Sequence, residues 1–443
     1  MKPFTIPKSC LLGSATSSLQ IEGGDRNNNW YRFAKEGHIR DGTSPEEACD
    51  HWNRWQTDVD LLAEMGHEIY RMSIEWSRVE PSPGHFDEHA LDRYAKEVAY
   101  LRKKGIEPLV TLHHFSEPIW FEDKGGWQKK QSVTLFLRYV GKVVQSLSPW
   151  VSDWVTINEP NVYLTAAHIE ATFPPAKRGM SHYLKGAANM IEAHVHAYKL
   201  IHEIGSLHWN HVKVGLALHI ADIEPEGFLT THLGSMVMEH NFHTIFLEGM
   251  TRGIIEAPLR KRSSIVPGIY ADFMGINYYA RYQVQPSWNP RTLFFKLGVK
   301  PTGRFNDLGW EIHPQGLYVK AKQLYEEYGL PIWITENGTC DRADAFRSRY
   351  ILEHLEVVTH LCRDGIPVER YYHWSTFDNF EWNLGLAPRF GLVAINYETQ
   401  GRFIRPSGKL YTKIIETRKV TKEMVAYYHD AVKPGRIPQY VRA

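Results

Sequence analysis

Two glutamates end apolar, β-branched segments of the chain, which is an unusual place for a carboxylate. The segment "WVTINEP" (154–160) leads into Glu159, and "IWITENG" (332–338) leads into Glu336 in the same way. Two carboxyl groups that face one cleft can cleave a glycosidic bond, because one protonates the departing oxygen while the other attacks or stabilises the sugar cation. The pair predicts a sugar-cleaving site if the fold brings the two positions together.

Each of these residues has a simpler explanation when it is taken alone. A single glutamate at a strand end is more often a helix N-terminal charge or an ion-pair partner, and a single tryptophan there usually serves packing. The pairing of Glu159 with Glu336 shifts the interpretation toward catalysis. A neighbouring negative charge raises the pKa of the acid, and a nearby cation lowers that of the nucleophile. Arg71, at the end of another apolar segment, is the candidate cation.

The pattern of the whole chain indicates how such positions can meet. Eight short β-rich segments alternate with amphipathic segments in which apolar residues recur every three or four positions. The predicted strands are 9–17, 67–75, 107–114, 153–159, 212–220, 272–280, 331–336 and 369–376. The predicted helices include 50–65, 88–104, 132–148, 182–205, 315–328 and 347–363. Eight such units predict an α/β fold, a closed (β/α)₈ TIM barrel that forms a single catalytic domain over residues 1–443.

The chain is longer than a minimal barrel of roughly 250 residues. We expect the extra length in long loops at the C-terminal face of the strands, with 161–181, 221–271 and 281–310 as candidates. This face carries the active site in such barrels. Seven of the eight predicted strands place polar or aromatic residues there. These residues are Gln20, Arg71, His113, His114, Asn158, Glu159, Asn277, Tyr279, Glu336, Asn337 and Trp374, and the cluster "FDNFEW" (377–382) follows the last strand.

Composition favours a soluble protein that acts on a small molecule. The formal net charge is +1, so there is no electrostatic reason to expect nucleic acid or a membrane as a partner. The start, "MKPFTIPKSC", lacks the apolar core of a signal peptide. The four cysteines have no metal-type spacing, so we expect free thiols in a reducing, cytoplasmic compartment and no metal site. The sequence leaves open whether the protein forms a homo-oligomer.

Ordered motifs along nearly the whole chain resemble the family 1 glycoside hydrolases, the β-glucosidase and β-glycosidase family. "TINEP" (156–160) and "ITENG" (334–338) resemble the acid/base and nucleophile motifs of that family. The other matching motifs are "LLGSATSSLQIEG" (11–23), "ACDHWNRWQTDVDLLAEMG" (48–66), "YRMSIEWSRVEP" (70–81), "GINYY" (275–279), "GWEIHPQGL" (309–317) and "WSTFDNFEWNLGLAPRFGL" (374–392). "NEP" alone would also fit xylanase-like barrels, so the number and order of the motifs carry the resemblance.

The resemblance implies a role for each matching residue. Glu159 would be the general acid/base and Glu336 the nucleophile of a retaining double displacement, with carboxyl groups about 5 to 5.5 Å apart. Asn158 would bind the sugar 2-hydroxyl, and Tyr279 would orient Glu336. The implied substrate-binding residues are Gln20, His114, Asn277, Trp374, Glu381, Trp382 and Trp310. No metal or organic cofactor is implied, because proton transfer and a covalent sugar ester suffice.

The resemblance also bears on the substrate, a small β-glycoside or oligosaccharide. Glu381 stands where relatives that cleave 6-phosphorylated sugars carry a serine, and a carboxylate there repels phosphate. Thioglucosidase relatives replace the acid/base with glutamine, whereas this chain keeps Glu159. We therefore expect a retaining exo-β-glycosidase for terminal, non-reducing, unphosphorylated β-D-glycosides. We expect β-glucosidase activity as the main activity, and β-galactosidase or β-fucosidase activity as a secondary one.

Three segments depart from the family pattern. Phe115 stands where most relatives carry tryptophan, "IEATFPPAKRG" (169–179) is closer to archaeal-type β-glycosidases, and "TCDRADAFRSRY" (339–350) is shorter than the usual loop. These departures leave the preferred aglycone open. Two alternatives also remain: a β-transglycosylase that uses the same site, and a non-catalytic carbohydrate-binding protein.

Overall fold

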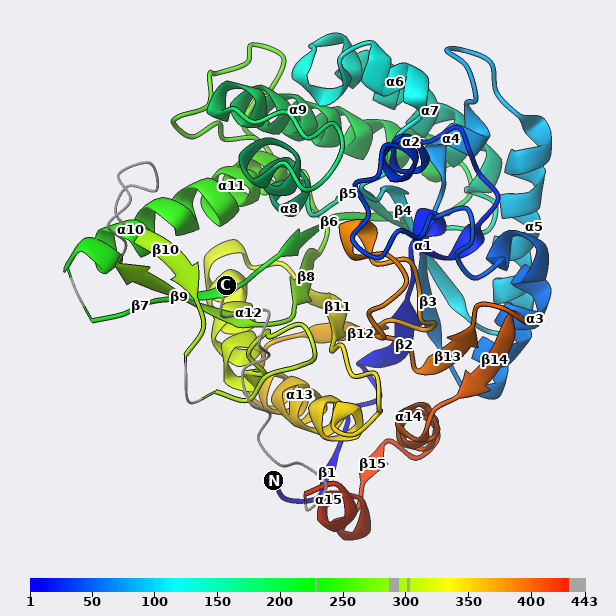
Figure 1. The fold of residues 1–443 in the computed structure, drawn as a ribbon, viewed down its shortest axis with the longest axis vertical. Helices are drawn as coiled ribbons and strands as arrows, with labels where there is room; N and C mark the ends of the chain where they lie inside the picture. Colours follow the sequence, from blue (N-terminus) through cyan, green and yellow to red (C-terminus); the bar gives the residue numbers. More distant parts are fainter. Residues whose placement is uncertain (210, 228, 287–294, 301–302, 430–443) are drawn as a thin grey trace.

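A closed barrel of eight parallel strands forms the centre of the molecule (Figure 1). The structure, a computed structural model, describes residues 1–209, 211–227, 229–286, 295–300 and 303–429. The barrel strands are β2 (Leu11–Ala15), β3 (Ile69–Ser73), β4 (Glu107–His113), β5 (Asp153–Asn158), β6 (Lys213–His219), β8 (Met274–Tyr278), β11 (Ile332–Gly338) and β12 (Val368–Trp374). Each of the eight predicted strands contains or overlaps one of them, and the predicted barrel is confirmed.

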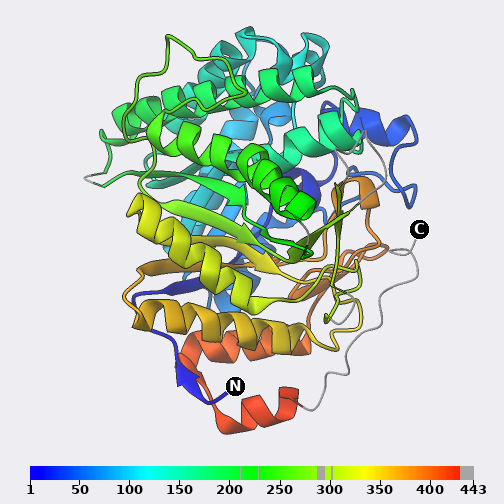
Figure 2. The ribbon, with the colours of Figure 1, turned by 90° about the vertical axis from the view of Figure 1, so that its left-hand side faces the viewer.

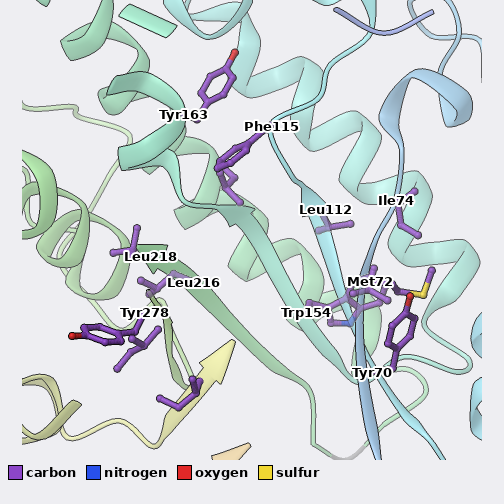
Figure 3. Close-up of a cluster of buried hydrophobic side chains, with 14 of the residues drawn as sticks. Tyr70, Met72, Ile74, Leu112, Phe115, Trp154, Tyr163, Leu216, Leu218 and Tyr278 are labelled. Carbon is purple, nitrogen blue, oxygen red and sulfur yellow. The ribbon is translucent and has the colours of Figure 1, made fainter. Parts of the chain in front are cut away.

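The barrel strands are rich in apolar residues because both of their faces are buried. Successive side chains of a strand point to opposite faces. Ile69 and Leu109 belong to the cluster inside the barrel, whereas Tyr70 and Trp154 belong to the larger cluster between the strands and the helices. Figure 3 shows part of this outer cluster. Burial on both sides explains why the sequence shows continuous apolar runs rather than strict alternation.

A ring of helices covers the outside of the barrel (Figures 1 and 2). Each barrel strand is followed, directly or after shorter elements, by one helix of this ring: α3 (His51–Glu64), α5 (Glu88–Lys103), α7 (Gln131–Leu147), α9 (Met180–Gly205), α11 (Ile245–Arg252), α12 (Pro314–Tyr328), α13 (Arg347–Arg363) and α14 (Pro406–Thr417). The six predicted helices are confirmed within a few residues. Each presents an apolar stripe to the strands, as Phe136, Val140 and Val143 of α7 do.

The segment 221–271, one of the candidates for a long loop, combines irregular chain with regular structure. That segment contains β7 (Asp222–Pro225), α10 (Leu229–Glu239), the π-helix His240–Thr244 and α11. The described part of 281–310 contains β9 (Arg281–Pro286) and β10 (Phe295–Gly298), which join β7 in a three-stranded sheet. The segment 161–181 begins inside α8 (Pro160–Thr165) and continues into the π-helix Ala166–Glu170. Regular structure therefore replaces much of the expected loop.

Shorter elements complete the described chain. They are α1 (Ser18–Glu22), α2 (Asn29–Lys35), α4 (Trp76–Val79), α6 (Ile119–Asp123), the 3₁₀ turns Gly126–Gln128 and Trp382–Leu384, the hairpin β13 (Val393–Asn396) and β14 (Gly401–Ile404), and α15 (Lys422–His429). β1 (Phe4–Thr5) pairs with β15 (Lys419–Val420), so the start of the chain lies beside its last described elements. All four cysteines are free thiols. None of the described helices is long and apolar enough to cross a membrane.

Candidate active site

A cavity of about 450 Å³ opens at the carboxyl ends of the barrel strands. Nine of the predicted site residues line it: His114, Asn158, Glu159, Tyr279, Trp310, Glu336, Trp374, Glu381 and Trp382. The other three, Gln20, Arg71 and Asn277, are fully buried and hydrogen-bond to residues of that set. The fold therefore gathers all twelve predicted residues around one cavity.

Glu159 lies at the point where β5 turns into α8. Its backbone adopts the left-handed conformation with φ 39°, an uncommon conformation for a residue with a side chain, and Pro160 begins the helix. The Glu159 N–H donates to the Ala217 carbonyl at 2.7 Å, and Oε1 accepts from Asn277 Nδ2 at 2.8 Å. Burial raises the pKa of Glu159 well above its usual value, and the charge of Glu336 raises it further.

Glu336 has a different set of partners. Arg71 Nη1 lies 2.5 Å from Glu336 Oε1, and the Tyr279 hydroxyl donates to Oε2. Burial raises the pKa of Glu336, but Arg71 and the Tyr279 hydrogen bond oppose that rise. Two residues after Glu336, strand β11 also approaches strand β12 closely. A Cβ on Gly338 would lie 1.7 Å from the Trp374 carbonyl oxygen. The two carboxyl groups thus differ in their readiness to ionise.

A buried network holds the groups beneath the two glutamates. Arg71 Nη2 and Asn277 Nδ2 both donate to Asn158 Oδ1, at 2.7 and 3.0 Å. The Thr335 hydroxyl donates to Asn277 Oδ1 at 2.6 Å, which fixes the orientation of that amide. Asn158 Nδ2 lies 3.1 Å from His114 Nε2. Because every one of these side chains is buried and hydrogen-bonded, the site is preorganised.

Glu381 adds a third carboxyl group to the cavity. Burial, and then the charge of Glu336, raise the pKa of Glu381 to about 8. Gln20 Nε2 lies 3.4 Å from Glu381 Oε2 and 2.9 Å from Asn379 Oδ1, while the Ser17 hydroxyl donates to Gln20 Oε1 at 2.6 Å. A protonated Glu381 donates as well as accepts hydrogen bonds, which suits a sugar hydroxyl.

Aromatic rings form much of the remaining wall. The His114 ring is roughly parallel to those of Trp374 and Trp382, with centroids 5.9 Å away in each case. Burial lowers the pKa of His114 well below its usual value, so the ring is neutral. Trp310 meets Tyr279 edge to face at 5.7 Å, and Phe115 meets Trp382 in the same way at 5.0 Å. Phe115 therefore does line the pocket despite its departure from the family pattern.

Comparison with known proteins identifies the family. Residues 2–420 match glycosyl hydrolase family 1. The chain belongs to this family. A β-glucosidase from Agrobacterium sp. is 33% identical over 442 residues, which cover 92% of this chain and 95% of that protein. The structure of a β-glycosidase from Pyrococcus horikoshii superposes with a TM-score of 0.89 at 35% identity, covering 96% of this chain and 98% of that one. A Thermotoga maritima β-glucosidase in complex with glucoimidazole gives 0.87 at 29% identity, covering 94% and 99%.

This family 1 hydrolase is therefore an O-glycoside hydrolase with β-glycosidase activity. Its cavity differs from the sequence-based prediction at two strand ends. His113 and Asn337 point into the helical layer, where His113 Nε2 lies 3.2 Å from Glu117 and Asn337 Nδ2 donates to the Tyr278 carbonyl at 2.7 Å. Successive side chains of a regular strand face opposite sides, and His113 and Asn337 accordingly face away from the cavity that His114 and Glu336 line.

Sequence reasoning missed several polar residues of the hydrolase's cavity, and one of them, His219 at the end of the fifth barrel strand, lies beside Glu159. Its Nδ1 lies 3.8 Å from Glu159 Oε1, and its ring stacks on Tyr279 with centroids 6.0 Å apart. Burial lowers the pKa of His219 to about 3, so it brings no positive charge to Glu159. The signal was present, since His219 ends the apolar run "VGLAL" as Glu159 ends its own.

One group in the described part of the hydrolase has the donor types of a metal site. Carboxylate oxygens of Asp222 and Glu224 and a ring nitrogen of His313 lie within 4.8 Å of one another. The Arg281 guanidinium already contacts Glu224 at 3.2 Å, and His313 faces Asp222 at 3.6 Å. We assign no metal to this group, because the guanidinium already supplies a cation there.

Proposed function

We propose that this hydrolase is a retaining exo-β-glycosidase for terminal, non-reducing, unphosphorylated β-D-glycosides. Glucosides are the main substrates, with galactosides and fucosides beside them. In the first step Glu336 attacks the anomeric carbon while Glu159 gives its proton to the leaving oxygen. In the second step Glu159 takes a proton from water, and that water displaces the sugar from Glu336. The 443 residues would form a single catalytic domain.

The unequal surroundings of the two glutamates support this assignment of roles. Glu336 bonds a guanidinium and a phenol hydroxyl, both of which stabilise its ionised form. Glu159 accepts from the neutral Asn277 amide and lies beside a neutral imidazole. The ionised member of the pair is thus Glu336 and the protonated one is Glu159. This division is what a nucleophile and a general acid require.

The remaining polar groups supply recognition of the sugar. Asn158, which Arg71 and Asn277 hold by hydrogen bonds, would bind the 2-hydroxyl next to the reacting carbon. Gln20, His114, Glu381 and Trp382 would hold the other hydroxyls, Trp374 would stack on the ring, and Trp310 would flank the leaving group. Glu381 and the rest of the lining disfavour a phosphorylated sugar, because no lysine or arginine is among the described residues that line the cavity, so an ionised phosphate would have no cation beside it.

The stereochemistry of the product tests the proposal. When an aryl β-glucoside is hydrolysed in an NMR tube, the first product signal should be that of the β-anomer, because two inversions restore the configuration. The α-anomer appears only later, by spontaneous mutarotation. An α-anomer that appears first would mean a single displacement and would overturn the mechanism.

A further inference from the structure

Glu75 is a buried carboxyl group between β3 and α4, and it is not among the residues that line the catalytic cavity. Three serine hydroxyls donate to it. Those of Ser77 and Ser116 donate to Oε1, both at 2.8 Å, and that of Ser18 donates to Oε2 at 3.0 Å. The serines belong to the segments that follow three consecutive barrel strands, β2, β3 and β4. One side chain thus ties three neighbouring strand-end segments together.

Two of these serines stand next to residues that would bind the sugar. Ser116 lies two residues beyond His114, and Ser18 lies two residues before Gln20. The turn at Phe115 has a left-handed backbone with φ 65°, which is uncommon for a residue with a large side chain. The helix α1 has only five residues and no side-chain hydrogen bond at its N-cap. Hydrogen bonds from outside each segment therefore help to fix its position.

The contacts of Ser77 indicate that this cluster holds a proton. Ser77 Oγ lies 2.8 Å from Glu75 Oε1 and 2.5 Å from Asp25 Oδ2. A hydroxyl has one hydrogen to donate, so one of the two carboxyl groups must donate the other hydrogen bond. Burial, and then the charges of Asp25 and Glu22, raise the pKa of Glu75 to about 7. The Arg78 guanidinium contacts Glu22 at 2.7 Å, and no ion pair of Glu75 occurs among the described residues. A neutral Glu75 fits this arrangement.

We propose that Glu75 is a positioning residue that fixes the two segments carrying Gln20 and His114. Its hydrogen bonds to Ser18 and Ser116 are the links to those segments. Glu75 acts through them, because it does not line the cavity itself. The inference rests on the proposed function, since it takes Gln20 and His114 as ligands of the sugar hydroxyls.

Deoxygenated aryl β-glucosides test this role. We define the deoxy ratio as kcat/KM for the full sugar divided by kcat/KM for the analogue that lacks one hydroxyl. The ratio should be roughly tenfold or more at a hydroxyl that bonds a buried, preorganised group. Gln20→Ala and His114→Ala identify which of the 3-, 4- and 6-hydroxyls each residue binds, because the ratio falls at that position. The 2-hydroxyl is the internal control, since Arg71 and Asn277 hold its proposed ligand, Asn158.

Glu75→Leu removes all three hydrogen bonds and keeps a side chain of similar size. It should lower the deoxy ratio at both identified positions by at least fivefold and leave the ratio at the 2-position within twofold of wild type. Glu75→Gln should keep the wild-type ratios, because an amide nitrogen can donate to Ser77 and Ser116 while its oxygen accepts from Ser18. Unchanged ratios in a folded Glu75→Leu enzyme would overturn the proposal. An equal fall at the 2-position would also overturn it, because the whole site would then have loosened.

Single serine variants test the two links separately, and they keep the proposal testable should Glu75→Leu fail to fold. Ser116→Ala should lower the deoxy ratio by about threefold only at the hydroxyl that His114 binds. Ser18→Ala should do the same only at the hydroxyl that Gln20 binds. Wild-type ratios in both folded variants would contradict the proposal.

Glu80→Leu is the matched control. Glu80 is also fully buried, five residues beyond Glu75, but it accepts from the Trp76 indole and the Gly84 N–H, which lie on or beside α4. This variant should lower the melting temperature and keep every deoxy ratio, and a fall like that in Glu75→Leu would overturn the positioning role. If wild-type enzyme hydrolyses no aryl β-glucoside, the proposed function fails. If it hydrolyses them but Glu75→Leu leaves the ratios unchanged, only the role of Glu75 fails.

Discussion

The two ends of the barrel both bury charged groups, but they treat them differently. At the end where the strands begin, Arg370 Nη2 lies 2.9 Å from Glu107 and 2.6 Å from Asp153, and Lys213 lies 2.9 Å from Glu369. At the other end four glutamates line one cavity, and the carboxyl groups of three of them, Glu159, Glu336 and Glu381, raise one another's pKa values. Among the described residues, the one guanidinium bonded to any of the three belongs to Arg71.

The charged groups at one end contribute to the stability of the fold, whereas those at the other end serve the reaction. Carboxylates that each contact a cation stabilise the folded chain or leave it unaffected, whereas an excess of buried carboxyl groups raises their pKa values and destabilises the fold at neutral pH. The second arrangement is useful because it keeps a proton available for a reaction. Substitutions at the catalytic mouth should therefore change activity and spare stability, and those at the opposite mouth should do the reverse.

The largest effect should come from Glu336→Ala. Loss of the nucleophile should lower kcat by roughly 10⁵-fold or more. Added azide should restore turnover by entering the vacated space, and the product should be the inverted α-glycosyl azide. A retained β-glycosyl azide from this variant would mean that Glu336 is not the nucleophile.

A smaller loss should follow Glu159→Gln. Without the proton donor, kcat/KM for an alkyl glucoside should fall by about 10²- to 10⁴-fold, and much less for an aryl glucoside whose phenol leaves without help. Deprotonation of Glu159 sets the alkaline limb of the wild-type pH profile, so that limb should be absent in the variant. Equal losses on good and poor leaving groups would argue against a role as the acid.

Arg370→Met, at the end of the barrel where the strands begin, should lower stability and leave activity unchanged. The substitution leaves Asp153 buried without its cation, so we expect the free energy of unfolding to fall by about 3 kcal/mol. Steady-state kinetics below the melting temperature should match wild type. A loss of activity as large as the loss of stability would show that the two ends are not independent.

The smallest effect should be a pH-dependent change in stability for Glu381→Gln. Because the folded-state pKa of Glu381 is raised to about 8, its contribution to stability is complete below about pH 4.5 and is lost as the pH rises through 8. Glutamine does not ionise, so the variant does not lose this contribution to stability as the pH rises. The variant should therefore gain melting temperature over wild type at pH 8.5 and gain none at pH 4.5.

Glu369→Gln at the opposite mouth is the matched control for that prediction. Burial of Glu369 opposes ionisation, but Lys213 and the Trp333 indole N–H hold its pKa below the usual value. The wild-type carboxylate thus stabilises the fold above its unfolded pKa of about 4.3 and loses that effect as the pH falls. This variant should lose stability at pH 8.5. The same sign of change in both variants would contradict the comparison between the two ends.

Much of the barrel could be predicted from the sequence because its strands are buried on both faces. Most strands contain an apolar run of several residues, and a polar residue or a proline marks the end of several of them, as Pro160 does after Glu159. The face to which each polar side chain points was less predictable. A shift of one residue exchanges the two faces, which is why Glu336 lies in the cavity and Asn337 does not.

The apolar part of the cavity was not predicted, and the reason lies in α10. Its residues do not show a clean helical stripe, because Leu233 and Met236 are exposed while Met238 faces the cavity. Apolar groups on opposite sides of a helix remove the period that identifies one. The π-helix His240–Thr244 interrupts the period again before α11. The cavity residue Met238 could therefore be found only from the structure.

Trapping of the covalent intermediate tests the division of roles most directly. A 2-deoxy-2-fluoro-β-glucoside with a good leaving group slows both steps but the second one more, so the glycosyl-enzyme should accumulate. Mass spectrometry of the digested protein should find one fluorosugar per chain, on the peptide that contains Glu336. A label on Glu159 or Glu381, or hydrolysis without any label, would contradict the proposed mechanism.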